Sequence, residues 1–370
     1  MTKTAPSEQD YLLLAVDHAS GEIAWTSKAI THTPHEGTHG DGSFATPTLV
    51  TDGERLFASF GSAGIFAYDL EGELLWQTDL GDMQVQGQFG EGSSPVLAGD
   101  KLILLWQHNG ESFLTALNTS DGKPAWRAAR PEGTSWTTPT VAGELVIVPS
   151  AAQTVAYSAK DGSVVWTYGE ASPPANTEQP ERREGGQGRP ERGGRGGRAG
   201  RGGFQSRSGL KGSAVLADGM VYFSTGGRRG GEFVALHAQK VEGEEETQLA
   251  WRTETDAPDV PSPVVVNGTL FGLKSNGGQL TALDVKSGEV RYAGERLEAL
   301  GNAYASPVAT AGHLIFSGRD GVFEVVAATE EFQSIHVNSL EDRFDASPAV
   351  LGDTLILRGH KSLYCIAKDE

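Results

Sequence analysis

The chain has 370 residues, of which 38% are hydrophobic and 21% charged, with a formal net charge of −18 and one cysteine. An acidic field of this size repels phosphate backbones, so we expect no nucleic-acid partner for the folded body. No apolar run is long enough to span a membrane as a helix, and a single cysteine excludes an internal disulfide. We expect a monomer that does not insert into membranes.

The first recurring pattern is a hairpin that ends on an aromatic residue. Residues 14–25 read LAVDHASGEIAW, and similar stretches return at 67–76, 116–126, 156–166 and 282–292. Each begins with an alternating apolar run, passes through a polar turn with a glycine, and ends in a second short strand. The constant offset predicts that the aromatic fills one kind of pocket between neighbouring repeats. These predicted docking residues are Trp25, Trp76, Trp126, Trp166, Trp251 and Tyr292.

A second pattern precedes the first in each repeat. It is a short strand, usually opened by Ser-Pro or Thr-Pro, then a glycine turn and a longer apolar strand, as in SSPVLAGDKLILLW at 93–106. Proline is tolerated at the first residue of a strand, where its missing N–H does least harm. Successive prolines of this pattern lie 41 to 48 residues apart where the repeat is regular. Four short antiparallel strands at that period predict an all-β fold, a β-propeller of four-stranded blades.

These residues resemble a known family. Ala-x-Asp-x-x-Ser-Gly-x-x-x-Trp with an upstream Ser-Pro-Val is similar to the repeat of PQQ-binding-like β-propellers, over roughly residues 11–167 and 210–367. That group includes quinoprotein dehydrogenases and the propeller lipoprotein of the β-barrel assembly machinery. The organisation looks most similar to exported members from planctomycete-like bacteria. The resemblance implies a periplasmic or exported protein, although residues 1–17 show no signal peptide.

The number of blades has two interpretations. Seven inner-strand starts are present, the last unit (346–367) has three strands, and residues 11–28 hold only a hairpin. The favoured interpretation is an eight-bladed parent with a truncated first blade. The alternative is a seven-bladed ring in which residues 22–28 close the last blade. Either way we expect residues 1–370 to form a single propeller domain, and Cys365, in a predicted strand, to be a core residue.

Residues 171–209 interrupt the rhythm of the blades. The segment is rich in Gly, Arg, Pro and Glu, and residues 178–207 carry 8 Arg and 4 Glu. Such a composition cannot bury enough apolar surface to order itself. We predict a disordered Gly/Arg-rich insertion between two blades. An RGG-like tether for nucleic acid or another polyanion is the functional alternative.

One group of residues could bind a metal. The connection THTPHEGTHGDGS at 31–43 contains His32, His35, His39 and Asp41. Three imidazoles and a carboxylate could hold Zn²⁺ or a similar ion, but such spacing arises easily by chance in a loop. We therefore expect no metal site and keep these four residues as candidates.

No catalytic residue can be assigned from the sequence. It contains no nucleophile elbow, Walker loop or His-Glu-x-x-His motif. The resemblance to quinoprotein dehydrogenases would imply a pair of adjacent cysteines that stack on the quinone. A chain with one cysteine cannot supply that pair. We expect a non-catalytic scaffold without a cofactor that binds protein or peptide partners through its channel face and blade edges. A propeller that binds a small molecule (PQQ, a sugar or a metal) is the alternative.

Overall fold

The computed structural model describes residues 3–4, 6–150, 152–170, 210–225, 231–243 and 245–367. The insertion predicted at 171–209 lies outside the described residues. Within them no helix is long and apolar enough to cross a membrane. Three 3₁₀ turns are present in this part of the chain: Gly61–Ala63, Gln86–Gln88 and Glu245–Gln248.

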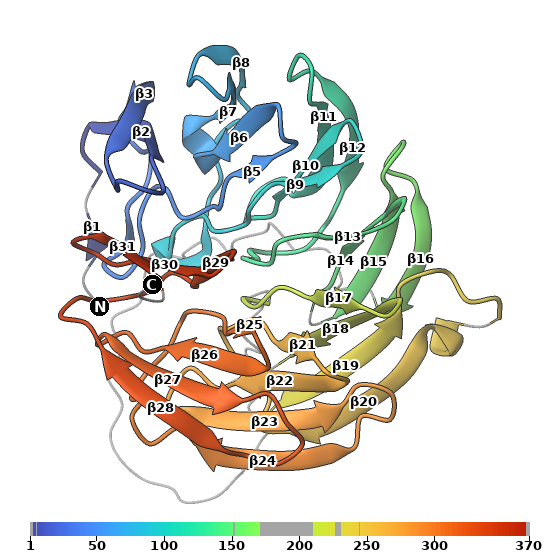
Figure 1. Ribbon diagram of the computed structural model, residues 1–370. Coiled ribbons are helices and arrows are strands. Elements are labelled where there is room, and N and C mark those ends of the chain that lie inside the picture. Colours follow the sequence, from blue (N-terminus) through green and yellow to red (C-terminus); the bar gives the residue numbers. More distant parts are fainter. Residues whose placement is uncertain are drawn as a thin grey trace, which may run out of the picture.

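Six four-stranded antiparallel sheets are arranged around a common centre (Figure 1). The first three contain β5 (Val50–Thr51), β6 (Arg55–Ser59), β7 (Ile65–Asp69) and β8 (Leu74–Thr78); β9 (Val96–Ala98), β10 (Lys101–Trp106), β11 (Phe113–Asn118) and β12 (Pro124–Ala129); and β13 (Thr140–Ala142), β14 (Leu145–Val148), β15 (Gln153–Ser158) and β16 (Val164–Gly169).

The next three have the same strand order. They contain β17 (Val215–Ala217), β18 (Met220–Ser224), β19 (Gly231–His237) and β20 (Leu249–Thr255); β21 (Val264–Val266), β22 (Thr269–Leu273), β23 (Gln279–Asp284) and β24 (Val290–Arg296); and β25 (Val308–Thr310), β26 (His313–Ser317), β27 (Val322–Ala327) and β28 (Ser334–Ser339). The predicted propeller of four-stranded antiparallel blades is confirmed.

A seventh sheet completes the count of blades. It has three strands, β29 (Ala349–Leu351), β30 (Thr354–Arg358) and β31 (Leu363–Ile366). Seven sheets therefore begin with an inner strand, which matches the seven-bladed alternative and not the favoured eight-bladed interpretation. That interpretation counted the N-terminal hairpin as a truncated blade, whereas in the part of the chain that the structure describes the hairpin pairs with no inner strand.

The hairpin consists of β2 (Gln9–Val16) and β3 (Ile23–His32), which form a two-stranded sheet of their own. It does not add a strand to β31, so the closure pictured in the seven-bladed alternative is absent from the described residues. One face of the hairpin, with Tyr11 and Leu13, is buried against Phe60 and Phe66 of the first blade. Two short strands, β1 (Lys3–Thr4) and β4 (Thr38–His39), pair beside it.

The apolar core lies between the blades. Phe57, Ile65 and Ala67 of the first blade pack against Leu102 and Leu104 of the second, and all five are nearly inaccessible to water. Burying a side chain of this kind contributes about 1.5–3 kcal/mol. Because similar clusters follow around the ring, each blade is stabilised mainly by its neighbours, as expected of a repeat architecture.

Candidate functional site

The predicted docking aromatics all lie on the outermost strand of their sheets and reach the next sheet. Each indole donates its Nε1–H to a backbone carbonyl of the following hairpin at 2.9–3.1 Å. The pairs are Trp25 with Leu70, Trp76 with Thr119, Trp126 with Ala159, Trp166 with Ala238 and Trp251 with Val285. The repeated tryptophan is thus a connector between blades.

The hairpin glycine provides the seat for the indole. A methyl group built on Gly122, Gly162 or Gly288 would lie 2.5 Å from the ring of the tryptophan that docks there. All three glycines have positive φ, so the turn and the close approach both require a residue without a side chain. Glycine and tryptophan of successive repeats therefore form one contact.

Tyr292 occupies the docking position with a different contact. The rings of Tyr292 and Phe332 meet edge to face at 5.9 Å. Phe332 holds the position of the hairpin glycine in the next blade, because it stands four residues before His336, as Gly288 stands four before Tyr292. The Tyr292 hydroxyl is buried and has no hydrogen-bond partner. Burial raises the pKa of this hydroxyl far above its ordinary value. Here a ring pair replaces the indole hydrogen bond.

A belt of hydroxyl groups, which the sequence analysis did not identify, links the inner strands. The backbone N–H of one blade donates to a Ser or Thr hydroxyl of the next in six successive links of 2.9–3.1 Å. The hydroxyls belong to Ser94, Thr138, Ser213, Ser262, Ser306 and Ser347. The Ser or Thr that usually precedes the repeat proline could have indicated this belt. Its hydroxyl accepts a backbone N–H of the preceding blade.

The structure does not assemble the four metal candidates into a ligand set. Nε2 of His35 lies 2.6 Å from the carbonyl oxygen of Met83, and His39 accepts the N–H of Asp41 at 3.1 Å. Nε2 of His32 is buried without a hydrogen-bond partner. Among the described residues no group of three His, Cys, Asp or Glu could hold a metal ion.

Asp41 instead belongs to an ionic cluster built from distant parts of the chain. It lies 2.7 Å from Nη2 of Arg343 and 3.0 Å from Nη2 of Arg319. Asp345 pairs with both arginines, and one of its carboxylate oxygens lies 2.9 Å from Nε2 of His360. These pairs connect the segment after the N-terminal hairpin to the last two blades.

A buried carboxyl lies near the predicted histidines. Glu91 accepts hydrogen bonds from the Ser62 N–H at 2.7 Å and from its hydroxyl at 2.5 Å. Burial raises the pKa of Glu91 above its ordinary value, and these hydrogen bonds oppose that shift. Glu91, His32 and His35 border a small pocket of about 30 Å³. This is enough room for a water molecule and too little for an organic ligand.

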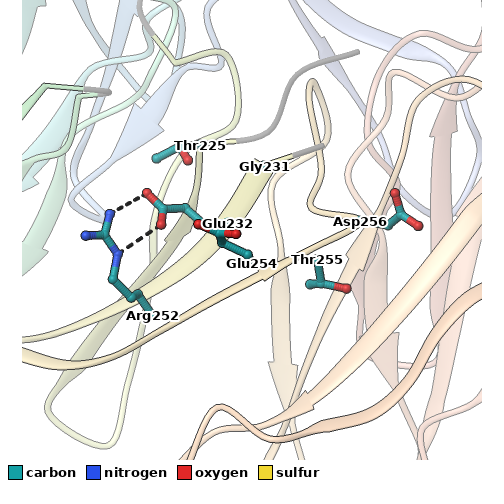
Figure 2. A pocket seen from close by; sticks show the side chains of 7 residues that line it. All are labelled: Thr225, Gly231, Glu232, Arg252, Glu254, Thr255 and Asp256. Carbon is teal, nitrogen blue, oxygen red and sulfur yellow. Dashed lines mark hydrogen bonds and ion pairs between the residues drawn. The ribbon is translucent and has the colours of Figure 1, made fainter. Parts of the chain in front are cut away.

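A groove of about 840 Å³ opens on the blade β17–β20 (Figure 2). It lies where β19 begins and β20 ends, and Glu232 and Glu254 face each other across these strands. Arg252 forms two hydrogen bonds with Glu232, at 2.7 and 2.9 Å. Thr225, Gly231, Thr255 and Asp256 complete the lining. Among the described residues that line the groove, three carboxylates outnumber one guanidinium.

Comparisons with known proteins agree with the fold. A family model described as outer membrane protein assembly factor BamB, of the PQQ_2 repeat type, matches residues 61–186. The structure of BamB from Moraxella catarrhalis is 14% identical with a TM-score of 0.63, over 98% of both chains. A europium-containing methanol dehydrogenase is 11% identical with a TM-score of 0.58, over 97% of this chain and 80% of that one. No curated protein matches the sequence.

The fold and the repeat define a β-propeller built from PQQ-like repeats. The resemblance to the PQQ-binding-like propeller family, inferred above from the repeat residues, is confirmed. At these identities the solved structures show the fold and not a shared activity.

Proposed function

We propose that this chain is a non-catalytic β-propeller scaffold, without a resident cofactor, that binds protein or peptide segments through its channel face and blade edges. The observation that carries the proposal is the groove on the blade β17–β20. It is open to solvent and lies where β19 begins and β20 ends, which suits a segment laid on the surface better than an enclosed small molecule.

The charges of the groove indicate the chemistry of the segment. Glu232 and Glu254 are direct cross-strand neighbours, so two like charges lie on the same face of the sheet. Glu232 pairs with Arg252, and Asp256 pairs with Lys274. Glu254 is therefore the carboxylate of the groove best placed to meet a ligand. A basic, extended peptide complements this surface.

A binding measurement tests the proposal. The probe is a fluorescein-labelled peptide of alternating arginine and threonine, RTRTRTRT, followed by anisotropy at low salt. We expect saturable binding that weakens as salt rises, and an affinity about threefold lower in Glu254→Gln, as befits one exposed charge pair. Glu289→Gln is the matched control. Glu289 is an exposed carboxylate in the hairpin between β23 and β24 of the next blade, and it does not line the groove. Equal losses in both variants would count against the groove.

Small-molecule binding is the second candidate, favoured by the ionic cluster. Nε of Arg343 is buried without a hydrogen-bond partner, and the guanidinium of Arg319 lies 4.0 Å from the centre of the Tyr304 ring. Two guanidinium groups could bind a carboxylated planar molecule such as PQQ. We expect a titration with PQQ, with and without Ca²⁺, to leave tryptophan fluorescence unchanged. Saturable quenching would favour the second candidate.

A further inference from the structure

The last blade has an uncovered strand. In the other six blades the third strand is paired on both sides, but β31 pairs only with β30 among the described residues. Two of its apolar side chains are exposed, Leu363 at 53% and Ile366 at 43%, where the corresponding residues Leu114 and Leu117 of β11 are fully buried. The outer edge of β31 therefore presents both unpaired backbone groups and apolar side chains.

The register of the other sheets shows which residue is missing beside β31. Each docking aromatic stands opposite an alanine of the neighbouring strand: Ala15, Ala67, Ala116, Ala156, Ala235 and Ala282. Ala116 also pairs with Ile103 on its other side, as Cys365 pairs with Ile356. Cys365 thus occupies the alanine position, and it is exposed. The prediction that Cys365 is a core residue is wrong, because no fourth strand of the described residues covers it.

The next hairpin along the ring carries an indole seat without an indole. Gly21 has φ +73°, and no atom of the described residues lies within 4 Å of a methyl group built on it. The turn has the same hydrogen bond as its equivalents, since Gly21 donates to Asp17 at 2.8 Å and Gly122 donates to Asn118 at 2.9 Å. By the same register, the carbonyl of His18 corresponds to the carbonyl of Thr119, which accepts a hydrogen bond from the Trp76 indole N–H.

The hairpin is also apolar on its open face. Leu12, Leu14 and Val16 alternate with Tyr11 and Leu13 along β2, and all three are exposed while the latter two are buried. Because the buried face packs on the first blade, the exposed face points the other way around the ring, toward the sector of the last blade. The pair of Asp41 with Arg343 joins these two sectors.

We propose that the edge of β31 and the Gly21 turn together form a binding site for an extended tryptophan-bearing strand of another polypeptide. The strand pairs with β31, places its tryptophan opposite Cys365, and rests the indole on Gly21 with its N–H on the carbonyl of His18. A Ser or Thr two residues after the tryptophan is part of the motif, because Ser27, Thr78 and Thr253 donate to the carbonyl of the next hairpin glycine. This site rests on the proposed scaffold function but not on the groove.

The test uses a peptide that carries the motif. A fluorescein-labelled peptide TQLAWRTET, the sequence of residues 247–255, is titrated against the full chain by anisotropy, and the rate of maleimide alkylation of Cys365 is measured in parallel. We expect saturable binding, and alkylation slowed about tenfold at a peptide concentration ten times the dissociation constant. The same peptide with alanine in place of tryptophan should neither bind nor protect Cys365.

A pair of glycine variants separates the seat from general effects. Gly21→Asn adds a side chain at the seat, and asparagine tolerates positive φ, so the fold is retained and binding is lost. Gly99→Asn is the matched control, since Gly99 also has positive φ and open space around it but lies in the turn between β9 and β10. It should bind as the unmodified chain does.

Three results would overturn the proposal: absence of binding to the folded chain, binding that survives Gly21→Asn, or protection of Cys365 without peptide in a concentration-dependent dimer. The last would assign the site to a second copy of the chain. Because RTRTRTRT addresses the groove, its binding and that of TQLAWRTET can fail independently.

Discussion

The indole of Trp126 lies directly against the backbone of Gly162 in the next blade. Its N–H donates to Ala159 at 2.9 Å, and a methyl group on Gly162 would come within 2.5 Å of the ring. The two residues belong to the same repeat motif, one blade apart, so each repeat supplies both a connector and a seat. The stability of the ring should depend on both.

Shortening the connector should weaken the ring in two steps. We expect Trp126→Phe to lower the free energy of unfolding by about 1 kcal/mol, because it removes one buried hydrogen bond. Trp126→Ala should cost about 3–5 kcal/mol, since it also leaves a cavity. Denaturant unfolding followed by circular dichroism measures both. A Trp126→Phe variant as stable as the unmodified chain would contradict the role of the hydrogen bond, and equal losses in both variants would contradict the role of the ring packing.

Filling the seat should destabilise the ring from the other side. Gly162→Ala combines a positive φ with a clash against the indole, so we expect about 2–4 kcal/mol of destabilisation. Gly143→Ala, in the turn between β13 and β14, has a similar φ but open space around it. It should cost only about 1–2 kcal/mol. Thermal unfolding of the two variants, compared side by side, gives the contribution of the contact.

The hydroxyl belt should respond to loss of a single hydroxyl. The Ser262 hydroxyl accepts the N–H of Ser213 at 2.9 Å. Ser262→Ala leaves that N–H without its acceptor, and we expect a loss of about 1–2 kcal/mol. Ser262→Thr keeps the hydroxyl and should restore most of the stability, because Thr138 already fills an equivalent position. Failure of the threonine variant to recover stability would argue that packing, not the hydrogen bond, matters there.

The buried carboxyl should make stability depend on pH. Burial raises the pKa of Glu91 in the folded chain, so the folded state binds this proton more tightly than the unfolded state. That stabilisation is fully present below the unfolded value, about 4.3, and is lost as pH rises through the folded pKa. We expect the melting temperature of Glu91→Gln, relative to the unmodified chain, to increase between acidic and neutral pH. A difference in melting temperature that does not change with pH would contradict this. Glu289→Gln, at an exposed carboxylate, is the control and should show no such change with pH.

The connectors could be predicted from the sequence because they are local. Trp126 and its turn lie within one repeat, and the constant offset indicated a common pocket without any knowledge of the neighbouring blade. The belt is different, because Ser262 and Ser306 meet across 44 residues and the Ser-Pro pattern was explained by the proline alone. A recurring hydroxyl at that position was visible, but its partner was not.

The charged sites depend on contacts that no local pattern contains. Asp41 and Arg343 are 302 residues apart, so the loop that suggested a metal site proved to be one side of an ionic cluster. In the groove, Glu232 and Arg252 meet because of the register between β19 and β20, which includes a bulge. Register shifts of this kind cannot be derived from alternation alone.

The measurement that tests the scaffold function most directly is hydrogen exchange by mass spectrometry of the full chain with and without RTRTRTRT. Bound peptide should slow exchange at residues 231–232, 252 and 254–256, which line the groove, and leave the hairpin turns at the opposite ends of the strands unchanged. Protection confined to other regions, or none at saturating peptide, would contradict the account.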